Sequence, residues 1–186
     1  MDRYYSLSVA GLKRDLKLFP VNEKLYIAAF ILFGDVELTE KCAAGLLEKA
    51  PAFDIMITAE SKGIPLIHEM ARQSGRNEYV VARKGPKVYM EDVVFVNVNS
   101  ITTASSQILC LGRKEAELIR GKRVLVVDDV ISTGESLTAI ERLVERVGGN
   151  IVAKMAVLAE GSAAKRDDIL FLEHLPLFDA NGSEIE

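Results

Sequence analysis

The sequence predicts an α/β fold with a mostly parallel central sheet flanked by helices. Apolar segments of strand length alternate along the chain with segments whose apolar residues recur at helical spacing. Such alternation favours right-handed strand–helix–strand units, in which neighbouring strands run parallel. Residues 124–127 are all apolar, which is typical of a strand that is buried on both faces of a parallel sheet.

The individual elements follow from apolar spacing and from the turn residues that bound each segment. Each predicted helix is followed within a few residues by a proline or a glycine. In the alternating part of the chain, helices are expected at residues 36–49, 64–74 and 137–147. Seven strands are expected at residues 53–58, 79–82, 93–98, 108–111, 123–127, 151–158 and 169–172.

The length predicts a single domain, residues 1–186, with its core at residues 50–175. Residues 1–35 precede the alternation, so we expect them to form a small N-terminal hood over the sheet. Within this part, Asn22 can cap a helix that starts at Glu23. The run from residue 25 to residue 33 is apolar nearly all round, which predicts a buried helix ending at Gly34.

The composition excludes several classes of protein. The formal net charge is −4, which provides no general attraction for nucleic acid. No apolar stretch of ~18 residues suggests a membrane span, and the N-terminus lacks the pattern of a secretory signal. Cys42 and Cys110 are far apart and, with His68 and His174, form no zinc-ligand pattern, so we expect free thiols in a reducing cytoplasm.

The segment from residue 124 to residue 136 carries the strongest chemical signal. An apolar strand leads into Asp128 and Asp129, a turn with Ser132, Thr133 and Gly134 follows, and a helix then begins. Ligands of open α/β sheets bind beyond the carboxyl ends of the strands. Backbone N–H groups at a helix N-terminus suit a phosphate, while adjacent carboxylates suit sugar hydroxyls or hydrated Mg²⁺.

Three other interpretations of this segment compete. An NTPase metal-binding strand would need a G-x-x-x-x-G-K-[ST] loop, and a dinucleotide site would need G-x-G-x-x-G after a strand; neither pattern occurs. Ser132 and Thr133 could simply cap the helix. Capping does not explain two adjacent acids above an apolar strand, where repulsion and desolvation call for a ligand or cation.

Residues 124–136 closely resemble the 13-residue phosphoribosyl-pyrophosphate (PRPP) signature of the type I phosphoribosyltransferases. Residues 58–65 resemble the pyrophosphate loop of that family, nearest to the adenine phosphoribosyltransferases. Residues 81–87 resemble their Arg-Lys-x-x-Lys stretch, and residues 158–160 and 172–178 fit their last strands loosely.

The resemblance implies a role for each matching residue. Asp128 and Asp129 would be the catalytic pair, holding the ribose hydroxyls and, indirectly, Mg²⁺. The 5′-phosphate would be bound by Ser132, Thr133, Gly134, Glu135 and Ser136. The pyrophosphate would be bound by Ser61, Lys62, Arg83, Lys84 and Lys87, some of them reaching a neighbouring subunit. The base would be bound within the hood by Leu12 and Arg14, and by Ile131.

The implied reaction transfers ribose 5-phosphate from PRPP to a base nitrogen and releases pyrophosphate. Catalysis would come from positioning, charge neutralisation and exclusion of water, without a covalent nucleophile. A mobile loop over the site is therefore expected, and the Ser/Thr-rich residues 99–107 have a suitable place and composition. We expect a homodimer whose partners are PRPP and a purine base, not nucleic acid or membrane.

The choice of base is less sharply determined by the sequence. The loop region between Val93 and Gly112 lacks the carboxylate that adenine enzymes carry, and Glu135 replaces a frequent glycine. Enzymes for 6-oxopurines often place a lysine after the late strand, where this chain has Glu160 and no lysine before Lys165. Adenine is therefore expected first. The alternatives are a 6-oxopurine enzyme, a PRPP-binding regulator with little catalysis, or an enzyme for a non-purine base.

Overall fold

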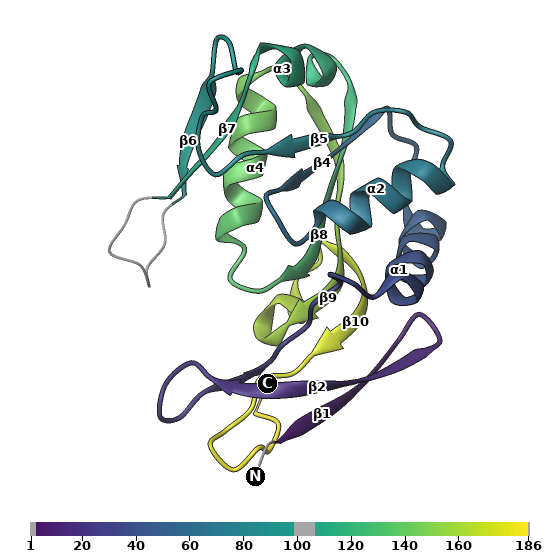
Figure 1. The fold of residues 1–186 in the computed structure, drawn as a ribbon, viewed down its shortest axis with the longest axis vertical. Coiled ribbons are helices and arrows are strands. Elements are labelled where there is room, and N and C mark those ends of the chain that lie inside the picture. The colour runs from purple at the N-terminus through teal and green to yellow at the C-terminus, as the bar shows by residue number, and fades with distance from the viewer. Residues whose placement is uncertain (1–2, 99–106, 186) are drawn as a thin grey trace.

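The computed structural model describes residues 3–98 and 107–185 and confirms the predicted α/β class. Its central sheet has the strand order β10-β9-β8-β4-β5, and every pair of neighbours is parallel (Figure 1). The strands are β4 (Ile55–Ala59), β5 (Val80–Ala82), β8 (Arg123–Ile131), β9 (Asn150–Glu160) and β10 (Leu170–Leu175). The loop predicted at residues 99–107 lies outside the described residues except for Gln107.

Helices cover both faces of this sheet (Figure 1). On one face α1 (Val36–Lys49) and α2 (Ile64–Gln73) bury their apolar sides against β8 and β9. On the other face lie α4 (Glu135–Arg146), α3 (Arg113–Ile119) and the antiparallel pair of β6 (Val94–Val98) and β7 (Gln107–Leu111). Helix α3 was not predicted, because only two of its seven residues, Ala116 and Ile119, are buried and the apolar period is too short to recognise.

The N-terminal residues form a three-stranded antiparallel sheet of β1 (Tyr4–Val9), β2 (Leu12–Pro20) and β3 (Tyr26–Ala28). Ala10 and Gly11 connect β1 to β2 with φ of +51° and +77°, the geometry of a type I′ hairpin turn. This sheet lies across the ends of β9 and β10, and β3 also pairs with the C-terminal segment through Tyr26 and Phe178 (Figure 1). Its buried residues belong to the same apolar cluster as those of α1 and α2.

The predicted buried helix over residues 25–33 is wrong. The chain is extended here, and its exposure alternates: Phe30 and Leu32 are buried, whereas Ile31 and Phe33 are each 52% exposed. An apolar run cannot distinguish a helix from an extended segment that buries every second side chain. Asn22 does accept hydrogen bonds from the N–H groups of Lys24 and Leu25, but they close a turn before β3 rather than starting a helix.

The strand that carries the two acids is longer than predicted. It continues for four residues beyond Val127 and pairs with β9 as far as Ile131, so Asp128 and Asp129 lie inside β8 rather than after it. The loop that follows therefore starts at the carboxyl edge of the sheet, where β9 ends at Glu160 and η1 (Gly161–Lys165) begins. No helix in the described ranges is long and apolar enough to span a membrane.

Candidate active site

Two loops meet at the carboxyl edge of neighbouring strands. Residues 60–63 connect β4 to α2 and residues 132–134 connect β8 to α4, and β4 and β8 are paired in the sheet. A cavity of about 230 Å³ lies between the loop after β4, the end of β8 and the start of α4. Its lining includes the predicted residues Ser61, Lys62, Lys84, Asp128, Asp129 and Ser136. A smaller cavity of about 60 Å³ is lined by Asp128 and by residues 130–137.

Asp128 lines both of these cavities, and its neighbour Asp129 lines the larger one. Asp129 is only 5% exposed, and its Oδ2 has no hydrogen-bond partner in the described structure. The backbone N–H of Asp129 donates to Asp128 Oδ1 at 2.9 Å. Burial, and then the charge of Asp129, raises the pKa of Asp128 well above 3.8, while the charge of Lys62 opposes this shift.

These carboxylates fit ribose hydroxyls and a divalent cation. An unpartnered buried carboxylate oxygen is costly unless a ligand donates to it or a cation compensates it. Within the described residues, no group of three or more His, Cys, Asp or Glu side chains could hold a metal by itself. Mg²⁺ here would accordingly depend on water and on substrate oxygens as well as on Asp128 and Asp129.

The loop after β8 offers backbone N–H groups, rather than charged side chains, to a ligand. Gly134 is the residue that precedes α4, its φ is +80°, and no side chain caps the helix. The alternative in which Ser132 and Thr133 merely cap α4 is therefore wrong. Uncapped N–H groups and the helix dipole make this turn suitable for a phosphate dianion.

The loop after β4 is packed tightly against the acid pair. A Cβ at Gly63 would lie 2.2 Å from Thr58 Oγ1 and 3.3 Å from Asp128 Oδ1, so only glycine fits. The peptide between Glu60 and Ser61 is cis. Lys62 is exposed beside this turn, and its charge partly offsets the rise that burial causes in the pKa of both Asp128 and Glu160. The ammonium group thus lies among the ends of β4, β8 and β9.

Glu60 was not predicted as a site residue, yet it organises the basic residues that follow β5. Its carboxylate accepts from the backbone N–H of Lys84 at 3.0 Å and forms an ion pair with Arg83 at 3.3 Å. The hydrogen bond from Lys84, followed by the charges of Arg83 and Lys87, keeps the pKa of Glu60 below its usual value. No sequence signal pointed to this contact, because Glu60 and Lys84 are separated by an entire helix and strand.

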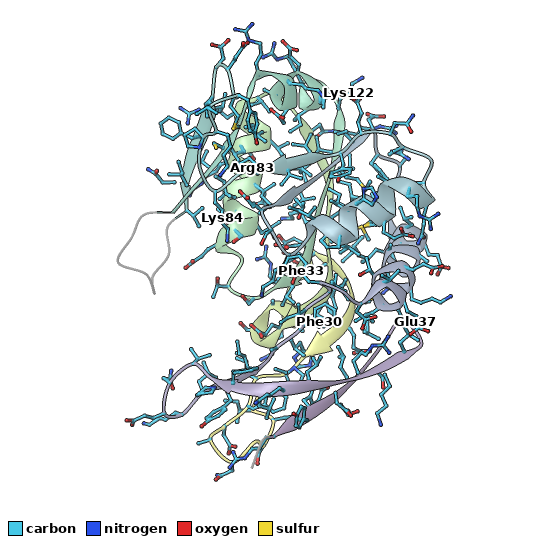
Figure 2. The ribbon with its side chains drawn as sticks, in the orientation of Figure 1. Phe30, Phe33, Glu37, Arg83, Lys84 and Lys122 are labelled. Carbon is cyan, nitrogen blue, oxygen red and sulfur yellow. The ribbon has the colours of Figure 1, made fainter. Side chains whose placement is uncertain are left out.

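Only some of the remaining predicted site residues line the two cavities at the carboxyl edge. Arg83 and Lys84 directly follow β5 (Figure 2), but of these two only Lys84 lines the larger cavity. Arg83 instead lines a separate cavity of about 330 Å³ next to α3, and Lys87 lines neither. Of the predicted base-binding residues, Ile131 lines the smaller cavity, although it is only 3% exposed.

Leu12 and Arg14 do not line either cavity at the carboxyl edge. Leu12 packs against the apolar cluster that the hood shares with α1 and α2. Arg14 forms ion pairs with Asp35 at 2.7 Å and with Glu37 at 2.9 Å, and these pairs join β2 to the start of α1. These contacts assign Arg14 a part in holding the hood to α1, and its contact with a base stays a prediction.

Known proteins resemble this chain along most of its length. The phosphoribosyl transferase domain matches residues 37–179. An adenine phosphoribosyltransferase of Mycobacterium tuberculosis is 30% identical over 152 residues, covering 82% of this chain and 69% of that protein. A hypoxanthine/guanine phosphoribosyltransferase of Methanococcus voltae is 34% identical over 113 residues, covering 61% and 56%.

Solved structures agree with these matches. Adenine phosphoribosyltransferase from Saccharomyces cerevisiae, complexed with adenine and an imino-altritol bisphosphate, superposes with a TM-score of 0.69 at 22% identity, covering 84% of this chain and 93% of that one. The enzyme from Thermoanaerobacter pseudethanolicus gives a TM-score of 0.65 at 20% identity, covering 77% and 84%. At such identities the likeness concerns the fold. Together with the family match and the signature at residues 124–136, it confirms the resemblance: the chain belongs to the phosphoribosyltransferase family.

Proposed function

We propose that this chain catalyses the transfer of ribose 5-phosphate from PRPP to adenine, forming AMP and pyrophosphate in purine salvage. The observation that carries the proposal is the cavity in which Lys62 and Lys84, the acid pair and Ser136 converge. It provides cationic groups for a pyrophosphate and carboxylates for ribose hydroxyls, and the smaller cavity, which shares Asp128 with it, provides an uncapped helix start for a phosphate. PRPP is a sugar with these two anionic ends. The adenine phosphoribosyltransferases among the relatives support the choice of base.

Each group has a defined part in the proposed reaction. Asp128 and Asp129 accept hydrogen bonds from the ribose hydroxyls and stabilise the positive charge that develops at the anomeric carbon. Lys62 and Lys84 neutralise the departing pyrophosphate, and the turn at residues 132–136 fixes the 5′-phosphate. Mg²⁺, when bound through Asp128 and Asp129 together with the substrate, would supply further positive charge for the leaving group.

The position of the base follows from the direction of attack. A single displacement without a covalent intermediate requires attack on the face of the sugar opposite the leaving group. With pyrophosphate over the end of β4 and ribose over β8, the base belongs on the β9 side, under the hood. There β9 ends at Glu160, whose pKa is raised by burial. Its carboxylate would accept a hydrogen bond from an exocyclic amino group, such as that of adenine.

A 6-oxopurine is the second candidate base. Hypoxanthine/guanine phosphoribosyltransferases are also among the relatives, including the one from Methanococcus voltae at 34% identity. An oxo group needs a donor, and the positive charge that acts on Glu160 at the end of β9 is that of Lys62, which is already assigned to the pyrophosphate. We therefore rank adenine first.

We further propose that the protein acts as a homodimer in the cytoplasm. Arg83 and Lys87 lie outside the cavity of their own chain, in keeping with the expectation that some basic residues serve a neighbouring subunit. Ile31, Phe33 and Val36 expose apolar side chains close to one another in sequence, as an interface would require. Cys42 and Cys110 are buried free thiols, compatible with a reducing compartment.

The proposal is tested by initial rates of pyrophosphate release from PRPP and Mg²⁺ with adenine, hypoxanthine, guanine, xanthine, uracil and orotate in parallel. Release with adenine alone supports the assignment. Release with an oxopurine alone would establish the second candidate. Saturable PRPP binding without release for any base would indicate a PRPP-binding regulator, and absence of PRPP binding would overturn the site itself.

A further inference from the structure

An arginine outside the PRPP signature lies against the turn that precedes α4. A Cβ at Gly134 would lie only 2.5 Å from Nη1 of Arg166, so the guanidinium fills the space that a side chain at residue 134 would need. Arg166 belongs to the segment between η1 and β10 and does not line either cavity at the carboxyl edge. It therefore touches the loop from outside, without occupying the place of the ligand.

The orientation of Arg166 is set by Asp168. Nε donates to Asp168 Oδ1 and Nη2 donates to Asp168 Oδ2, both at 2.8 Å. This two-point contact holds the planar guanidinium by one edge and directs Nη1 at Gly134. A lysine could supply the charge at this place but could not make the paired contact.

Asp168 is also anchored to the helix that starts at the loop. It accepts a hydrogen bond from Lys154 of β9, and Lys154 forms an ion pair with Glu141 of α4 at 2.6 Å. Burial lowers the pKa of Lys154, but its contacts with Asp168 and Glu141 outweigh this effect, and the net shift is upward. The series Gly134, Arg166, Asp168, Lys154 and Glu141 thus runs from the turn before α4 to two turns along the same helix.

We propose that Arg166, held by Asp168, is a positioning residue for the 5′-phosphate: it braces the left-handed turn at Gly134 and so keeps the first N–H groups of α4 directed at the phosphate. The proposal rests on the function proposed above for the loop at residues 132–136. A turn that needs positive φ and has no side-chain cap has few contacts of its own to fix it. Donors that are already in place bind an anion more tightly than donors that must first be ordered.

Binding of the two ends of PRPP as separate fragments tests this role. We expect Arg166→Gln to weaken ribose 5-phosphate binding about tenfold while the affinity for pyrophosphate, which binds at the other loop, changes less than about twofold. Arg166→Lys should resemble Arg166→Gln, because the paired contact with Asp168 is lost in both. Asp168→Asn should cause a smaller loss in the same direction. Arg142→Gln removes a positive charge from the exposed face of α4 and serves as the matched control, with no change expected.

Hydrogen exchange of the ligand-free protein tests the brace without relying on the proposed function. Residues 132–137 should exchange faster in Arg166→Gln than in the wild type, and at the wild-type rate in Arg142→Gln. Unchanged exchange overturns the brace. Recovery of ribose 5-phosphate affinity in Arg166→Lys would mean that only charge matters, and equal losses for both fragments would mean a general structural role; either result also overturns it. Failure of the wild type to bind ribose 5-phosphate would instead remove the proposed function, while the exchange result would still decide whether Arg166 braces the turn.

Discussion

The loops after β4 and β8 line two cavities that share Asp128, but the two loops differ in the groups that they offer to a ligand. The loop after β8 relies on backbone N–H groups at an uncapped helix start. The loop after β4 relies on side-chain charge: its Lys62 lines the larger cavity together with Lys84, which follows β5, and its Glu60 binds Lys84 and Arg83. In the loop after β4, Gly63 is required because neighbouring atoms leave no space for a Cβ. In the loop after β8, Gly134 is required because the backbone has a positive φ.

This contrast suits two ends of one substrate that have different fates. The 5′-phosphate stays on the sugar throughout the reaction, so fixed backbone donors are sufficient. The pyrophosphate leaves and gains charge as its bond to the sugar breaks, which favours cationic side chains that respond to developing charge. The acid pair lies at the boundary, where the sugar must be held while one end departs.

The largest effect is expected where the two loops meet. Asp128→Asn combined with Asp129→Asn should lower the rate of pyrophosphate release at least ~10³-fold, because both ribose contacts and the Mg²⁺ site are lost. The fold should remain, since the substitution removes two adjacent acids from a buried position. Full turnover in a double variant with wild-type circular dichroism would refute the site.

The same double variant tests the electrostatics of the pair. Because the pKa of Asp128 is raised above 3.8, the folded protein holds that proton more tightly than the unfolded chain does. This contribution to stability is complete below the unfolded pKa and is lost as the pH rises through the folded pKa. Thermal unfolding as a function of pH should show this decline in the wild type and a smaller one in the double variant; parallel curves would contradict it.

Substitutions at Gly63 and Gly134 should have the next largest effects, and each should affect only its own loop. Gly63→Ala places a methyl group against Thr58 and Asp128, which is expected to lower the stability of the fold by about 1–3 kcal/mol. It should also weaken the binding of pyrophosphate. Gly134→Ala should instead reduce ribose 5-phosphate affinity, since alanine disfavours a φ of +80° and displaces Arg166. Gly85→Ala is the control, because a Cβ there meets nothing within 4 Å. If both variants weakened the binding of both fragments to the same extent, the assignment of one fragment to each loop would be wrong.

A smaller and more selective change is expected at Lys62. Lys62→Ala should weaken pyrophosphate binding roughly tenfold and leave ribose 5-phosphate binding nearly unchanged, because one charged contact is lost at one loop only. Lys122 is exposed just before β8, at the amino edge of the sheet (Figure 2), so Lys122→Ala removes the same charge away from the site at the carboxyl edge. Equal losses for both fragments, measured by isothermal titration, would argue against the assigned role.

The smallest effect is expected at the amino end of β8. The carboxylate of Asp54 accepts from the backbone and side chain of Arg123, and these bonds lower its pKa. Asp54→Asn should lower the unfolding temperature slightly at neutral pH and progressively less as the pH falls below the usual Asp value, where the wild type also loses the pair. Fragment affinities should not change. A change in either affinity would show that the carboxyl edge is not energetically separate from the amino edge.

The two loops also differ in how far the sequence predicts them. The loop after β8 is contiguous with its strand and helix, so residues 124–136 indicate both its structure and its ligand. The loop after β4 depends on Glu60 reaching Lys84, and the brace at Gly134 depends on Arg166. Such contacts join residues that lie far apart in the chain, and no local pattern encodes them.

The hood illustrates a second limit. An apolar stretch such as residues 25–33 has no period that separates helix from strand, and its extended structure depends on packing against α1 and on pairing with Phe178. The core is predictable because its strands and helices repeat apolar residues at distinct periods. The identity of the base is harder to predict from the sequence, because the base would lie between this hood and Glu160 and the structure of the hood is itself not predicted.

The most direct test of the account is displacement of PRPP, bound with Mg²⁺, by ribose 5-phosphate and by pyrophosphate in separate titrations. If the loops after β4 and β8 hold opposite ends of one PRPP molecule, each fragment displaces it competitively, with one PRPP site per chain. Displacement by only one of the two fragments would contradict the account, because one loop would then play no part in binding PRPP.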